Sequence, residues 1–259
     1  MGINLTTKDK WEKGWANVEL PAIYKPVYDV QKLLELYLPK TTTFSLIEIG
    51  CAPGKRMAYF NNHFGYKVSG LEYAEAAAVT TKKNMEMLAI DADLLVQDFF
   101  TFDCGRNKYN IVFSAGFIEH FSDVSSVVQR ICALSWQYVV TIVPNLYGIN
   151  GFISKTIRPK VYAEHNPIDA LTLDLVHRNC GMKTLFCDYI GGVRFIMPGA
   201  HTAFFNRHKY CARAVNAPVR VFNRLSMEIE KLLHCTPRYK LLSRDLMYVG
   251  IKEASSEQG

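Results

Sequence analysis

Residues 45–60 read SLIEIGCAPGKRMAYF, and this stretch carries the strongest structural signal in the chain. An apolar run over 46–49 leads into Gly50, Gly54 and Lys55. A short apolar run that ends in a glycine turn and continues into helix-forming residues is typical of a strand, a tight turn and a helix. The question is which ligand such a turn holds.

A nucleotide phosphate is the first candidate, because Lys55 directly follows a glycine. A Walker A loop, however, has four residues between its glycines and a Ser or Thr after the lysine. Here three residues separate the glycines and Arg56 follows the lysine, while Pro53 removes one backbone donor. The dinucleotide fingerprint G-x-G-x-x-G also fails, since it requires glycine at Ala52. The turn is therefore suited to a different ligand.

Three acidic residues mark the ends of successive strand-like runs. Glu48 lies two residues before Gly50, Glu72 ends the next run, and Asp98 ends the third beside Phe99. An acidic residue at the position of Glu72 can accept hydrogen bonds from the two hydroxyls of a ribose. Asp98 can accept from an adenine amine while Phe99 packs on the base. A site so rich in carboxylates favours a cationic nucleoside over a triphosphate, which it would repel.

The rest of the chain alternates between two periodicities. The strand-like runs are 44–50, 66–73, 92–98, 109–116 and 138–144, followed by 182–190 and 246–252. Helix-like segments are 27–38, 54–63, 74–89 and 122–135, and 198–243 reads as mostly helical. Strands that alternate with helices predict βαβ units. We therefore expect an α/β fold of the Rossmann-like, doubly wound type, with a mostly parallel seven-stranded sheet and helices on both faces.

Length, cysteine content and charge distribution indicate the kind of protein and the kind of partner. A chain of 259 residues with 49% hydrophobic content fits one globular domain. Its seven cysteines form no C-x-x-C pair, which argues against a zinc site and a disulfide framework and favours a cytoplasmic location. Between residues 196 and 244 there are nine Lys or Arg and only two Glu, a local excess that points to an anionic partner.

Four motifs in order resemble the class I S-adenosylmethionine-dependent methyltransferases: IEIGCAPGKRMAYF, GLEYAE, QDFF and VFSAGFIEHFSD. The last is similar to the fourth-strand motif of the small-molecule group that includes the ubiquinone-type O-methyltransferases. The resemblance spans about residues 10–195 and returns in YVGIK, the last strand. Its main departure is Ala52, which stands where the family has the middle glycine of its turn.

The resemblance implies S-adenosylmethionine as cofactor and assigns its contacts residue by residue. The methionine end would be surrounded by Glu48, Gly50, Cys51, Ala52 and Gly54. The ribose and adenine would be met by Glu72, Tyr73, Asp98 and Phe99. Backbone contacts along the methionine would come from Ser114, Ala115 and Gly116.

Two histidines are candidates for catalysis. His120, which follows the fourth strand, is interpreted either as a general base for an acceptor hydroxyl or as a neutral histidine that shapes the pocket. Glu119 and His120 together leave a divalent cation open, but with no further ligand in view we assign no metal. His165 is expected near the substrate, with the alternative that Asn166 beside it caps a helix.

The predicted organisation has four parts. They are an N-terminal helical lid (1–40), the cofactor-binding core (41–195), a basic helical insertion that caps the acceptor (196–245), and the last strand with a polar tail (246–259). Within the first part, WEKGWANVELP resembles a helix that covers the cofactor in the family.

The sequence leaves the acceptor open. We expect methylation of a small-molecule, glycan or natural-product acceptor, most simply at oxygen, with an anionic substrate favoured by the basic insertion. The alternatives are an RNA methyltransferase and a cofactor-binding subunit without catalysis. No nucleic-acid-binding module is recognisable, so we do not expect nucleic acid as a partner, whereas residues 196–245 could contact a membrane surface.

Overall fold

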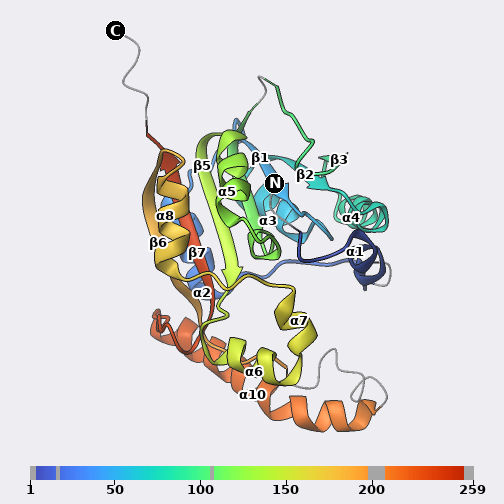
Figure 1. Cartoon of the computed structure of the whole chain (residues 1–259), viewed down its shortest axis with the longest axis vertical. Helices are drawn as coiled ribbons and strands as arrows, with labels where there is room; N and C mark the ends of the chain where they lie inside the picture. Colours follow the sequence, from blue (N-terminus) through green and yellow to red (C-terminus); the bar gives the residue numbers. More distant parts are fainter. Residues whose placement is uncertain (1–3, 16–17, 106–107, 198–207, 254–259) are drawn as a thin grey trace.

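The computed structural model describes residues 4–15, 18–105, 108–197 and 208–253, and it is built around one seven-stranded sheet (Figure 1). The strand order is β3-β2-β1-β4-β5-β7-β6. The strands are β1 (Ser45–Ile49), β2 (Lys67–Glu72), β3 (Ala92–Val96), β4 (Tyr109–Ala115), β5 (Ser135–Pro144), β6 (Met182–Val193) and β7 (Ser243–Lys252). Strand β7 pairs antiparallel with both β5 and β6, and all the other pairs are parallel. The predicted α/β, doubly wound, mostly parallel sheet is confirmed.

Helices cover both faces of the sheet (Figure 1). One layer consists of α2 (Tyr28–Tyr37), α3 (Lys55–Phe64) and α4 (Glu75–Met87), and the other of α5 (Val124–Ala133) and α8 (Ala170–Arg178). Successive strand residues point to opposite faces. Leu46 therefore joins the core under α2 and α3, whereas Ile47 joins the core under α5 and α8. This two-sided burial explains why the run after Ser45 is continuously apolar.

Three elements between β5 and β6 were not expected from the sequence: α6 (Ile149–Ile157), α7 (Pro159–Ala163) and α8. The insertion between β6 and β7 also has different limits from those predicted. Antiparallel pairing of Val193 with Ser243 extends both strands beyond their apolar runs, so β7 begins three residues earlier than the predicted 246. Its helix is α10 (Lys209–Leu233). Residues 234–242 of the predicted helical segment form turns and irregular structure instead, and residues 198–207 lie outside the described residues.

Candidate active site

A cavity opens at the carboxyl ends of β1, β2 and β4, where doubly wound sheets bind their ligands. Eight of the sequence-predicted residues line it: Gly50, Ala52, Glu72, Tyr73, Phe99, Ala115, Gly116 and His120. They come from five separate stretches of chain that only the fold brings together. Their roles in binding remain predictions, but their positions define one site.

The glycine turn forms one wall of this cavity. Gly50 has a φ of +69° and Gly54 a φ of +82°, both in the left-handed region that favours glycine. A Cβ on Gly50 would lie 3.1 Å from the ring of Phe117. The Gly50 N–H donates to the Leu71 carbonyl at 2.9 Å, which ties the turn to the end of β2. The backbone is thus held close to the space where a ligand would sit.

Glu72 lies at the end of β2 with its carboxylate largely buried beside the cavity. Its Oε1 accepts a hydrogen bond from the Ala74 N–H at 3.0 Å, which fixes the side chain. Burial raises the pKa of Glu72, and the backbone N–H groups around it partly oppose that shift. A fixed carboxylate at this position is well placed to accept hydrogen bonds from a diol.

Six predicted residues lie outside the cavity wall: Glu48, Cys51, Gly54, Asp98, Ser114 and His165. Asp98 is exposed, and its Oδ1 accepts from the Phe100 N–H at 2.6 Å as a local turn cap, while its neighbour Gln97 lines the cavity. Cys51 is buried, and burial raises the pKa of its thiol, which disfavours the reactive thiolate. The contact of Asp98 with adenine stays a prediction.

Charged groups that the sequence analysis did not assign also line the cavity. Lys55 and Arg56 face it from the first turn of α3. Arg56 donates to Oε1 of the buried Glu48 at 3.3 Å, so that carboxylate helps to position the guanidinium. Burial raises the pKa of Glu48 to about 7. No local sequence signal marks Arg56, because its partner lies in the preceding strand.

The N-terminal segment covers the cavity. Asn4, Thr6, Trp11 and Trp15 line it, and the last two lie on α1 (Lys8–Trp15). The segment is attached to the core because the Leu5 N–H donates to the His120 carbonyl at 2.8 Å. Of the predicted lid, 1–40, residues between Asn4 and Trp15 line the cavity and α2 packs on β6, while the lid role itself stays a prediction.

The carboxylate of Glu12 ties α1 to α4, in addition to an ion pair between Lys8 and Glu75 and a hydrogen bond from Thr80 to the Trp15 carbonyl. The two oxygens of Glu12 accept from the N–H groups of Glu75 and Ala76, each at 2.7 Å, which caps the N-terminus of α4. Replacing Glu12 by alanine should loosen the lid and weaken binding of S-adenosylhomocysteine by about three- to tenfold, mostly through faster dissociation. Stopped-flow and calorimetry would measure this. Glu19→Ala, an exposed carboxylate outside α1, is the matched control, and equal effects of both variants would contradict the assignment.

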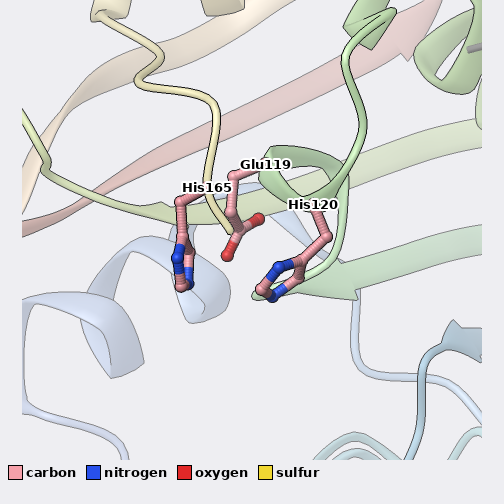
Figure 2. A group of neighbouring side chains, drawn as sticks. All are labelled: Glu119, His120 and His165. Carbon is pink, nitrogen blue, oxygen red and sulfur yellow. The ribbon is translucent and has the colours of Figure 1, made fainter. Parts of the chain in front are cut away.

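Glu119, His120 and His165 point toward one another (Figure 2), with ligand atoms that all lie within 4.8 Å of each other. The first two end the turn after β4, and His165 follows α7. Nδ1 of His120 lies 3.0 Å from the Glu164 carbonyl, and Nδ1 of His165 lies 2.6 Å from the Val161 carbonyl. Both Nδ1 atoms therefore carry the proton, and each ring keeps Nε2 as its basic atom.

Burial controls the charges of this cluster. It lowers the pKa of His120 to about 4, with repulsion from His165 as the second cause, and it lowers the pKa of His165 as well. Burial raises the pKa of Glu119 to about 8. Burial therefore favours the uncharged form of all three groups. The same three side chains could also hold a divalent cation.

Asn166 does not cap the helix that follows it. The helix that follows begins at Ala170 and is capped by Asp169, whose Oδ1 accepts from the Thr172 N–H at 2.8 Å. Asn166 instead donates its backbone N–H to the Glu119 carbonyl at 2.6 Å. That bond joins the two segments of the histidine cluster, and only the tertiary structure could reveal it.

Comparison with known proteins shows a similarity to methyltransferases. Residues 46–135 match the family described as a methyltransferase domain. No curated protein matches the chain by sequence. Residues 46–135 are thus similar to a methyltransferase domain, and solved structures that share the fold include methyltransferases with bound S-adenosylmethionine or S-adenosylhomocysteine.

Solved structures share the fold at low identity. Geranyl diphosphate C-methyltransferase from Streptomyces coelicolor, with Mg2+, geranyl diphosphate and S-adenosylhomocysteine, has 13% identity and a TM-score of 0.61, covering 95% of this chain and 98% of that one. Magnesium protoporphyrin IX methyltransferase from Synechocystis, with bound S-adenosylmethionine, has 10% identity and a TM-score of 0.52, covering 87% of this chain and 78% of that one. The [4+2]-cyclase SpnF has 12% identity and a TM-score of 0.59, covering 88% of this chain and 81% of that one. These likenesses establish the fold, and the cyclase shows that the fold alone does not fix the reaction.

Proposed function

We propose that this protein transfers the methyl group of S-adenosylmethionine to a hydroxyl oxygen of a small-molecule, glycan or natural-product acceptor. The observation that supports this best is one cavity that joins the glycine turn, Glu72 and Phe99 to His120. The first three groups suit a nucleoside ligand, and the histidine suits removal of a proton. S-adenosylhomocysteine is the expected second product.

The cofactor would lie across the ends of β1 and β2. The backbone at Gly50 and Gly116 would meet its methionine part, and the carboxylate of Glu72 would accept hydrogen bonds from the ribose hydroxyls. The ring of Phe99 would pack on adenine. Trp11 and Trp15 would then cover the ligand from α1 and exclude water, which strengthens every polar contact inside.

The chemistry needs positioning and one proton acceptor. S-adenosylmethionine would supply the methyl group and leave as the thioether S-adenosylhomocysteine, while Nε2 of His120 would accept the proton that the acceptor hydroxyl loses. Correct positioning can supply roughly 7–11 kcal/mol at its best. Transfer of the proton to a base supplies about 10²–10⁴-fold more for a weakly acidic hydroxyl.

Lys55 and Arg56 support an anionic acceptor, because both line the cavity and could bind a carboxylate or phosphate. The basic insertion gives no such support, since none of its described residues, 208–245, lines the cavity. Its role as an acceptor cap stays a prediction. RNA methylation remains the alternative. An absence of tight binding to bulk RNA at physiological salt would count against it.

Two measurements test the proposal. Calorimetry with S-adenosylmethionine and S-adenosylhomocysteine should show binding at micromolar to low millimolar concentration, and absence of binding would refute it. A panel of hydroxylated acids, phosphorylated sugars and RNA, assayed with radiolabelled cofactor, should show transfer to one of the first two groups. Binding without transfer to any acceptor would favour a non-catalytic subunit.

The pH profile should identify the base. Because the pKa of His120 is lowered to about 4, its imidazole is neutral above that value, and kcat/KM should stay level from pH 5.5 to 7.5 and fall as the pH decreases toward 4. A profile that instead rises with pH through a midpoint near 8 would assign the base to Glu119, whose pKa is raised to about 8.

A further inference from the structure

The long helix α10 has an unusual distribution of side chains between its two faces. It lies at the lower edge of the molecule, outside the layers that cover the sheet, and it contacts β6 and α2 (Figure 1). Its solvent-facing side carries large apolar residues at helical spacing: Val221, Phe222, Leu225, Ile229, Leu232 and Leu233. Leu225 is 57% exposed and Leu232 79% exposed. Apolar stripes of this size mark interaction surfaces.

The opposite face of α10 is polar and holds the helix in this orientation. The side chain of Asn223 accepts from the Phe195 N–H at 3.0 Å and donates to the Phe195 carbonyl at 2.8 Å. Glu230, two turns further along, forms a buried ion pair with Arg194. Rotating the helix to bury its apolar stripe would break these bonds and leave charged groups unpaired, which is strongly unfavourable. The apolar stripe is therefore directed outward by the fold.

A row of cations runs parallel to this stripe. Arg213, Arg220, Arg224 and Lys231 are spaced by seven, four and seven residues, which places them along one side of the helix, and all four are exposed. Of the two acidic residues in α10, Glu230 is buried and Glu228 pairs with Lys231 at 3.2 Å. The exposed surface thus combines an apolar stripe with a positive flank.

We propose that α10 lies in the interface of an anionic lipid bilayer, with its apolar stripe among the acyl chains and its basic row at the head groups. The apolar stripe from Val221 to Leu233 lies beyond Pro218, is about 20 Å long and can lie flat along a membrane. Among the described residues no helix is apolar and long enough to span a bilayer, so the attachment is peripheral. The positive flank selects a bilayer over an apolar protein surface. This proposal does not depend on methyl transfer.

Vesicle flotation of the full chain tests the proposal. In 0.1 M NaCl, binding to vesicles of 70% phosphatidylcholine and 30% phosphatidylglycerol should exceed binding to pure phosphatidylcholine by at least about tenfold, and 0.5 M NaCl should reduce it. Leu225→Gln with Leu232→Gln should lower binding at least about tenfold. Arg220→Gln with Arg224→Gln should lower binding by a similar factor and weaken its salt dependence.

Matched controls come from surfaces elsewhere on the chain. Leu171→Gln with Leu175→Gln changes exposed leucines of α8, and Lys82→Gln with Lys83→Gln changes exposed lysines of α4. Both should bind vesicles as the wild type does. Circular dichroism checks that each variant folds.

Two results would overturn the proposal. One is that the folded wild-type protein floats with neither type of vesicle. The other is a wild-type dimer that the leucine variant converts to a monomer, without vesicle binding by either, as measured by light scattering. That outcome would assign the apolar stripe to a second copy of the chain.

Discussion

Glu72→Ala should lower the affinity for S-adenosylhomocysteine by about 30- to 700-fold, the largest effect on binding that we expect. The variant removes a carboxylate that would accept two hydrogen bonds from the ribose, which together are worth about 2–4 kcal/mol. Calorimetry at a single pH measures the change directly. Because burial raises the pKa of Glu72, the wild type and the variants are compared at the same pH.

The controls separate ligand binding from local structure. Glu72→Ala also loses the acceptor for the Ala74 N–H, so a thermal melt is needed to show that the variant folds. Glu72→Gln keeps an oxygen at that place and should show an intermediate loss of affinity. Glu86→Ala, an exposed carboxylate on α4, should bind as the wild type does. Unchanged binding by a folded Glu72→Ala protein would remove the ribose role.

His120→Ala should reduce kcat by about 10²–10⁴-fold while the affinity for S-adenosylhomocysteine changes little. Nε2 of His120 is the proposed proton acceptor, and the ring is fixed by the bond between Nδ1 and the Glu164 carbonyl at 3.0 Å. Its contact with Trp11, at 5.1 Å between ring centroids, makes a small loss of cofactor affinity reasonable. An unchanged kcat would show that the histidine only shapes the pocket.

A second arm of this experiment distinguishes a base from a metal ligand. Wild-type activity should survive dialysis against EDTA if His120 acts as a base. Loss of activity with EDTA and its return with a divalent cation would assign Glu119, His120 and His165 to a metal instead. His63→Ala, on the opposite face of the sheet, is the matched control and should keep full activity.

The sheet and the cofactor end of the site were predictable because their signals are local. Each buried strand needs a continuous apolar run, and the turn at Gly50 needs a residue that tolerates positive φ. Glu72 follows its strand directly, so its place at the edge of the sheet is fixed by chain order. Asp98 shows the limit of such reasoning, since its side chain caps its own turn.

The substrate side of the site depended on the tertiary structure, because its contacts join residues far apart in the chain. Nothing near Glu12 indicates that it caps a helix at Glu75, and nothing near His165 indicates that it meets His120. The same holds for α10, whose periodicity the sequence shows without saying which face is turned outward. By itself the sequence determined the fold and the class of ligand, because the apolar runs of buried strands, the glycine turn and the acidic residues at strand ends can each be recognised from neighbouring residues. Only the tertiary structure showed how Glu12 attaches the predicted lid helix to α4, how the histidine cluster forms and which face of α10 is exposed, because each depends on which distant groups compete for burial and hydrogen bonds.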